Sequence, residues 1–212
     1  MEAFKNHRGL IATLDRANVD TDQIIPKQFL KSIKRTGFEA NLFHDWRYLS
    51  NGLPNPEFEL NQNRFKNATI LVTRNNFGCG SSREHAVWAI QQYGFKAVIA
   101  PVQERGSSRI PAFADIFRNN STKNGLLTVE LKDSEVEEIF QMANRYQGLQ
   151  ATVDLEHQRF TLHLPEEISF HFDIDSSVKE HLTRGLDEIE QTLQFQDKIK
   201  SFESSHNNQL SR

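Results

Sequence analysis

The residues best suited to chemistry lie together in one short segment, Gly78-Cys79-Gly80-Ser81-Ser82-Arg83. Its two glycines allow backbone N–H groups to approach a ligand closely, and Arg83 carries a planar fork that can bind a carboxylate through two hydrogen bonds. A predicted helix follows, and the first N–H groups of a helix are unpaired and carry partial positive charge. These features predict a site for an anionic ligand, either a carboxylate or a phosphate.

Four residues in or just after this segment have alternative roles. Ser81 and Glu84 have the spacing of a capping box, so Ser81 could cap the helix. The two roles are compatible, because a capping hydroxyl is exposed at the same helix end. His85 is expected to pack or to form hydrogen bonds rather than to catalyse. A Cys79–His85 nucleophile, as in Cys–His hydrolases, is a further alternative.

The segment lies inside a predicted strand–loop–helix–strand unit. Ala68–Thr73 and Lys96–Ala100 are apolar runs typical of buried strands, and Pro101 is expected to end the second. Between them, Arg83–Tyr93 has helical spacing, and Gly94 stands where a C-terminal cap belongs. Such a unit has parallel strands and a right-handed crossover. Because ligands bind beyond the carboxyl ends of parallel strands, the unit places the segment at a binding edge.

The rest of the chain predicts an α/β fold with a mixed parallel and antiparallel sheet and flanking helices. The other expected elements are a strand at 8–14, helical turns at 28–33, a helix at 113–117, a strand at 126–131, a helix from a Ser134–Glu137 capping box to Gly148, a hairpin at 150–155 and 159–164, a strand at 168–172, and helices at 178–182 and 186–202. We expect one domain over 1–203, with a helical extension from about residue 178 and a disordered tail at 204–212.

Composition excludes several classes of protein. The 212 residues are 37% apolar and 25% charged with a net charge of −3, which fits a folded chain with a core and offers no basic surface for nucleic acid or a membrane. No apolar run approaches the roughly 20 residues that a bilayer requires. The single cysteine, Cys79, excludes an internal disulfide and a metal or iron–sulfur site built on cysteines of this chain. A cytoplasmic location is expected.

Two longer motifs resemble a known family. The stretch Asn76-Phe77-Gly78-Cys79-Gly80-Ser81-Ser82-Arg83-Glu84-His85-Ala86 is similar to the signature of the swivelling domain of the aconitase superfamily. The stretch Asn18-Val19-Asp20-Thr21-Asp22-Gln23-Ile24-Ile25-Pro26-Lys27-Gln28-Phe29-Leu30 resembles the N-terminal signature of one branch, the small subunits of 3-isopropylmalate dehydratase. Other motifs match in the same order, namely Thr36–Phe38, Phe43–Tyr48, Tyr93–Phe95, Phe113–Phe117 and Gly185–Asp187. The resemblance therefore covers nearly the whole chain.

The resemblance implies a swivelling β/β/α domain and a role as one subunit of a hydro-lyase. The implied reaction interconverts 2-isopropylmalate and 3-isopropylmalate through isopropylmaleate in leucine biosynthesis. The implied partner is a large subunit that carries a [4Fe–4S] cluster, whose iron would take the leaving hydroxyl, with no metal in this chain. The substrate would be a small hydroxy dicarboxylic acid.

The resemblance also implies roles for individual residues. Ser81 matches the residue that acts as the base, as an alkoxide that removes a C–H proton. Ser82 and Arg83 match positions that bind a substrate carboxylate. A second group of residues lies in a segment similar to the one that selects the substrate in this family, namely Lys27, Phe29 and Leu30. The alternative role for this segment is packing in the core.

One departure from the family pattern is an insertion. The stretch 102–112 stands where the family usually has a single residue between Ala100-Pro101 and Phe113. We expect an exposed polar loop there, and no second anion site although Gly106-Ser107-Ser108-Arg109 echoes the first. Two further hypotheses stay open. The substrate could be methylmalate, citraconate or homoaconitate, or the chain could be a non-catalytic anion-binding module.

Overall fold

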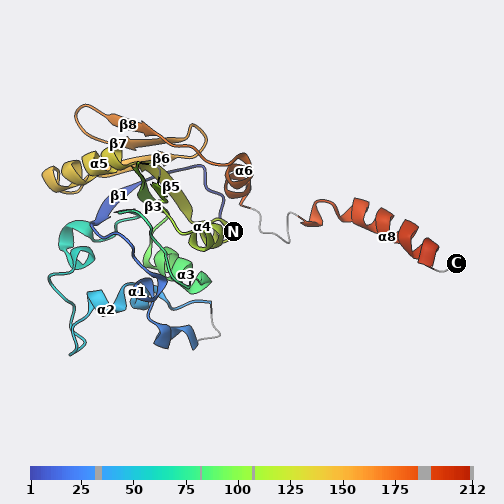
Figure 1. Ribbon diagram of the computed structural model, residues 1–212, viewed down its shortest axis with the longest axis horizontal. Helices are drawn as coiled ribbons and strands as arrows, with labels where there is room; N and C mark the ends of the chain where they lie inside the picture. The colour runs from blue at the N-terminus through green and yellow to red at the C-terminus, as the bar shows by residue number, and fades with distance from the viewer. Residues whose placement is uncertain (32–34, 82, 107, 186–191, 211–212) are drawn as a thin grey trace.

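The computed structural model describes residues 1–31, 35–81, 83–106, 108–185 and 192–210 (Figure 1). The strands are β1 (Asn6–Leu14), β2 (Ile70–Thr73), β3 (Ala97–Arg105), β4 (Ser108–Ile110), β5 (Leu127–Lys132), β6 (Gln150–Asp154), β7 (Arg159–Leu162) and β8 (Ile168–His171). The helices are α1 (Thr21–Ile24), α2 (His44–Arg47), α3 (Glu84–Tyr93), α4 (Asp115–Asn124), α5 (Asp133–Arg145), α6 (Ser176–Arg184) and α8 (Gln196–Leu210). Short 3-10 helices cover Lys27–Lys31, Glu39–Asn41, Glu59–Asn61 and Asn63–Phe65.

Strand β1 joins a parallel half and an antiparallel half of one sheet. Its residues Ile11–Leu14 pair in parallel with β2, and its residues Asn6–Leu10 pair antiparallel with β6. Strand β3 lies parallel to both β2 and β5, whereas β6, β7 and β8 form an antiparallel meander. The sheet order is β4-β3-β2-β1-β6-β7-β8, with β5 also on β3. The predicted mixed sheet and the parallel βαβ unit are therefore confirmed.

Side chains that alternate along the strands build a core on each face of the sheet. In β2, Leu71 joins one buried cluster, whereas Ile70 and Val72 join the other. The first cluster includes the buried sides of α3 and α4, and the second includes α5 and strands β6 to β8. Figure 1 shows α1, α2 and α3 on the side of the sheet opposite to α5. Helices thus cover both faces, and the loops at the carboxyl ends of the parallel strands remain at an edge.

The insertion at 102–111 forms a hairpin rather than the polar loop that we expected. Strand β3 continues past Pro101 to Arg105, and β4 returns antiparallel to it. Pro101 did not end the strand, because the ladder from β3 to β2 already stops at Ile99. The missing N–H therefore leaves no ladder bond to β2 unmade, and proline is tolerated in a strand at such a position.

Helix α5 begins earlier than its predicted capping box. The N-cap is Lys132, whose backbone N–H donates to the carboxylate of Glu135 over 2.9 Å. Because β5 runs directly into the helix, Ser134 already lies inside the first turn and cannot cap it. Glu137 instead accepts a hydrogen bond from Arg74 over 2.7 Å, which ties α5 to the end of β2.

The C-terminal region contains a packed helix and a separate one. Helix α6 buries Leu182, as a helix at 178–182 predicts. Helix α8 continues to Leu210, through most of the segment 204–212 where a disordered tail was expected, and Figure 1 shows it apart from the rest of the molecule. Residues 186–191 of the predicted helix at 186–202 lie outside the described residues. Over the part of the chain that is described, no helix is long and apolar enough to cross a membrane.

Candidate active site

The glycine-containing loop after β2 is bound along one side to the loop after β1. The N–H groups of Gly78 and Cys79 donate to the carbonyl of Val19 over 2.8 and 3.2 Å, and Thr21 N–H donates to the carbonyl of Cys79 over 3.0 Å. These bonds form a short parallel bridge between the two loops. The two motifs that carry the family resemblance, far apart in the sequence, are thus hydrogen-bonded to each other.

The same loop is bound along its other side to the segment that leads into α4. Phe77 N–H donates to the carbonyl of Ala112 over 2.9 Å, and Ala114 N–H donates to the carbonyl of Phe77 over 3.0 Å. The inserted hairpin therefore returns the chain directly to the loop that carries Ser81. The loop therefore has main-chain hydrogen bonds along both of its sides, as a central strand of a sheet has. These bonds restrict its motion.

Both glycines of this loop have a left-handed backbone and close neighbours. Gly78 has φ +75°, and a Cβ on it would lie 2.2 Å from Cγ of the buried Phe117. Gly80 has φ +84°, and its Cβ would lie 3.1 Å from Oδ2 of Asp20. Left-handed backbone and close neighbours together admit only glycine at Gly78 without a shift of the structure.

Ser81 does not cap the helix, so the predicted capping box with Glu84 is wrong. Helix α3 begins at Glu84, and its N-cap is Arg83, in an extended conformation with no capping hydrogen bond from its side chain. Ser81 lies two residues before that cap, in a position that the capping geometry does not use. Both Ser81 and Arg83 are exposed at the amino end of α3, and Ser82 lies outside the described residues.

The loop after β1 leads into α1, and Lys27 follows that helix. Asp20 caps α1, because its Oδ1 accepts from the N–H of Asp22 over 2.6 Å and its own N–H donates to Gln23 over 2.9 Å. Lys27 Nζ forms an ion pair of 3.0 Å with Asp22. Asp20 was missed by the sequence reasoning, although an Asp followed three residues later by Gln is a capping-box signal.

Phe29 and Leu30 lie half-buried in the 3-10 helix that follows α1 and pack against the core on that face of the sheet. The ring of Phe29 lies 4.9 Å from that of His44, which in turn lies 5.1 Å from Tyr48. Core packing, the alternative role for these residues, is therefore present. Their contact with a substrate stays a prediction.

Electrostatics and packing argue against a Cys–His nucleophile. Burial, followed by the charge of Asp20, raises the pKa of the Cys79 thiol, which keeps it protonated near neutral pH. The ring of His85 packs against Trp88 at 4.8 Å and edge-on against Phe38 at 5.3 Å. His85 is thus a packing residue, as the sequence predicted.

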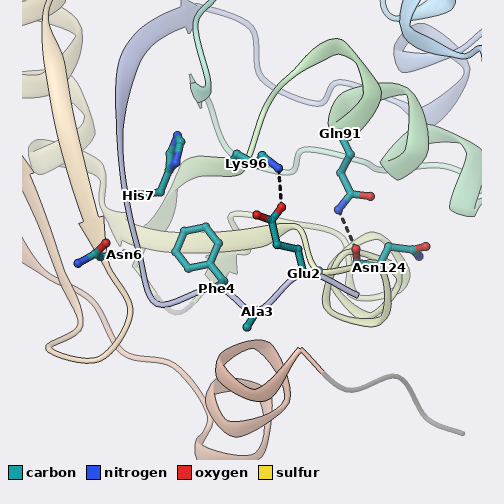
Figure 2. A pocket seen from close by; sticks show the side chains of 9 residues that line it. Glu2, Ala3, Phe4, Asn6, His7, Gln91, Lys96 and Asn124 are labelled. Atoms are coloured by element: carbon teal, nitrogen blue, oxygen red, sulfur yellow. Dashed lines mark hydrogen bonds and ion pairs between the residues drawn. The ribbon is translucent and has the colours of Figure 1, made fainter. Parts of the chain in front are cut away.

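A cavity of about 170 Å³ lies at the opposite end of the parallel strands. Figure 2 shows its lining side chains, with Glu2 paired to Lys96 over 3.0 Å and Gln91 donating to the Asn124 carbonyl over 2.7 Å. Lys96 directly precedes β3, so this cavity faces away from Ser81. Because these polar groups already bind one another, they need no ligand to satisfy their hydrogen bonds.

Comparison with known proteins agrees with this geometry. Residues 1–134 match the family described as the aconitase C-terminal domain. The chain is 55% identical over 204 residues to a 3-isopropylmalate dehydratase small subunit from Desulforapulum autotrophicum, and the match covers 96% of this chain and 95% of the relative. The fold resembles the crystal structure of a 3-isopropylmalate dehydratase from Methanocaldococcus jannaschii, with a TM-score of 0.62, 23% identity, and coverage of 93% of this chain and 99% of that one.

The expected swivelling-domain fold is therefore confirmed by family and by structure. The match covers nearly all of both chains and leaves no large region of either unmatched. The chain belongs to the aconitase superfamily, in the family of 3-isopropylmalate dehydratase small subunits.

Proposed function

We propose that this chain is the small subunit of a two-chain hydro-lyase that interconverts 2-isopropylmalate and 3-isopropylmalate through isopropylmaleate, a step of leucine biosynthesis. The observation that carries the proposal is the full-length similarity to a subunit of that name, on a chain in which Ser81 is exposed beside the bridged motif loops. An exposed site of this kind suits an active centre that is completed by a second subunit. The single cysteine fits a reducing compartment, so we place the complex in the cytoplasm.

Ser81 removes the proton from the substrate carbon that carries hydrogen. The C–H electron pair becomes the double bond, and the hydroxyl on the neighbouring carbon leaves and takes up a proton as water. A free serine hydroxyl is too weak a base for this step, so nearby donors and cations must stabilise its oxyanion. We expect Arg83, exposed two residues further along the chain, to be one such cation.

Arg83 and Ser82 bind a substrate carboxylate, and Lys27 adds positive charge at the loop after β1. The guanidinium of Arg83 matches a carboxylate in geometry and charge. Phe29 and Leu30 supply the apolar contact that an isopropyl group requires. Substitution of these two residues should change the relative turnover of isopropylmalate and of smaller acids such as methylmalate.

We assign the [4Fe–4S] cluster to the large subunit. Among the described residues of this chain, no three His, Cys, Asp or Glu side chains are arranged to hold a metal ion, and the chain contains one cysteine. A cluster of this kind is ligated by several thiolates, so this chain's residues do not fit it. The cluster would supply a Lewis acid, and this chain would supply the base and carboxylate-binding groups.

The test is turnover by the reconstituted complex. The chain is mixed with its large subunit after anaerobic rebuilding of the cluster, and isopropylmaleate formation is followed from 3-isopropylmalate, with methylmalate and homoaconitate offered in parallel. Turnover should require both chains and be fastest with the isopropyl substrate. Faster turnover of another acid would reassign the substrate, and activity of the large subunit alone would overturn the subunit role.

The assignment of the base is tested by Ser81→Ala. We expect turnover to be lost while the complex still forms on a sizing column, because Ser81 is exposed and contributes little to the core. Ser169→Ala serves as the matched control, because Ser169 is an exposed serine on β8, beyond β1 in the antiparallel half of the sheet. Full activity of Ser81→Ala would overturn the role of the base.

A further inference from the structure

Two asparagines at the base of the site have backbone conformations that would favour glycine. Asn18 has φ +56° and Asn76 has φ +58°, both in the left-handed region. Asparagine tolerates this region better than other residues with a side chain, but glycine adopts it at less cost. The presence of asparagine at both positions therefore needs a reason beyond the backbone.

The side chains provide that reason, because they bind each other. Asn76 Nδ2 donates to Asn18 Oδ1 over 2.8 Å, across the two loops that carry the family motifs. The bond lies where the loops leave their strands, beside the bond from Asn18 N–H to the carbonyl of Asn75. Asn76 is the second residue before Gly78, whose own N–H donates to Val19.

We propose that Asn18 and Asn76 form a side-chain latch that positions the Ser81 loop for catalysis, without contact with the substrate. The latch fixes the direction in which each loop leaves its strand, and so the place of Ser81 relative to a substrate held largely by the other subunit. An error of about 1 Å in the position of a catalytic group can cost on the order of a hundredfold in rate. The expected effect on turnover rests on the proposed function, whereas the effect on how the two loops are held together does not.

Glycine substitutions separate the latch from the backbone, because they keep the left-handed conformation and remove only the amide. In the reconstituted enzyme, Asn18→Gly and Asn76→Gly should each lower kcat about three- to tenfold, the range for one lost hydrogen bond, with a smaller change in KM. The double variant should be no slower than the more affected single variant, since both remove the same bond.

Two further variants make the kinetic test specific. Asn18→Asp keeps an acceptor for Asn76 Nδ2 and tolerates the left-handed region, so its kcat should stay within about twofold of the parent. Asn67→Gly is the matched control, because Asn67 is exposed, has φ +63° and lies just before β2, at the far end of that strand from the site. It should leave kcat unchanged. Equal losses in Asn18→Gly and Asn18→Asp, or no loss in either glycine variant of the pair, would overturn the latch.

Hydrogen exchange of the isolated chain tests the latch independently of substrate. Asn76→Gly should speed amide exchange in the peptides that cover 16–21 and in those that cover 74–80. Asn67→Gly should leave exchange in both segments unchanged. If the parent complex does not turn over isopropylmalate but this exchange pattern appears, the proposed function fails and the latch stands. Unchanged exchange in Asn76→Gly would show that the side-chain bond does not hold the loops.

Discussion

At the scale of single residues, the site depends on a few side chains whose surroundings decide their chemistry. Cys79 and Ser81 are two residues apart in the same loop, yet of the two only Ser81 is exposed. Cys79 is partly buried beside Asp20, and both burial and that negative charge raise the pKa of its thiol. A loop that contains both a thiol and a hydroxyl therefore presents only the hydroxyl for chemistry.

The raised pKa of Cys79 predicts slow alkylation. A group whose pKa is raised holds its proton to higher pH, so at pH 7 less thiolate is present than in a free cysteine, and the thiolate is the reactive form. Iodoacetamide should react with the native chain more slowly than with the urea-unfolded chain, and the rate should rise at higher pH. Asp20→Asn should move that rise to lower pH, because it removes a negative charge. A native rate at pH 7 above that of the unfolded chain would contradict the assignment.

At the scale of elements, close packing between α4 and the loop decides where the loop can run. Phe117 of α4 lies against Gly78, and its ring also packs edge-on against Phe77 at 5.3 Å. Arg74, just before the loop, binds Asp15 after β1 and Glu137 of α5, and lies 4.0 Å from the ring of Phe140. The ends of β1 and β2 are thus fixed to α5, and the loop beyond them is fixed to α4.

Gly78→Ala should destabilise the fold by more than its backbone strain alone. The new Cβ would meet the Phe117 ring at 2.2 Å, and overpacking in a buried place costs typically about 1–3 kcal/mol beyond the strain of a left-handed alanine. Gly52→Ala is the matched control, since Gly52 has φ +79° and nothing within 4 Å of the added Cβ. Urea unfolding of both variants gives the difference. Equal losses of stability would show that Phe117 moves aside freely.

At the scale of the whole molecule, the sheet and the two cores form a body from which α8 stands apart. Large apolar side chains in and just before α8 are exposed, namely Leu193, Phe195, Ile199 and Phe202. In contrast, α6 contributes the buried Leu182 to the core. The stability of the body should therefore depend on α6 and not on α8, while the extent of the domain over 1–203 stays a prediction.

A chain that ends at Gly185 should unfold at nearly the same temperature as the full chain. The removed side chains at 192–206 are exposed, so their loss takes little apolar surface out of the core. Leu182→Ala in the full chain should instead cost about 2–5 kcal/mol, the usual loss for a buried leucine. Calorimetry of the three proteins makes the comparison. A large fall in the unfolding temperature of the shortened chain would place α8 within the cooperative unit.

Much of the fold followed from local patterns in the sequence. The apolar runs near 70 and 97, the helical spacing up to Tyr93 and the alternation after Gln150 each depend on near neighbours in the chain. The structure has an element at each place, although β3 runs beyond its predicted end to Arg105. The place of Ser81 between strand and helix followed from the same patterns, because the order of elements in a βαβ unit determines which edge its first loop occupies.

Other features depended on segments that only tertiary structure brings together. Ser81 and Glu84 have capping-box spacing, yet Arg83 became the cap, because bonds to Val19 and Ala112 on either side fix the loop before α3. Pro101 did not end β3, because the pairing of β3 with β2 already stops at Ile99. The contact of Asn18 with Asn76 joins residues 58 positions apart. Composition and spacing report which groups a chain can offer, whereas the partner of each group depends on long-range packing, which short-range patterns do not contain.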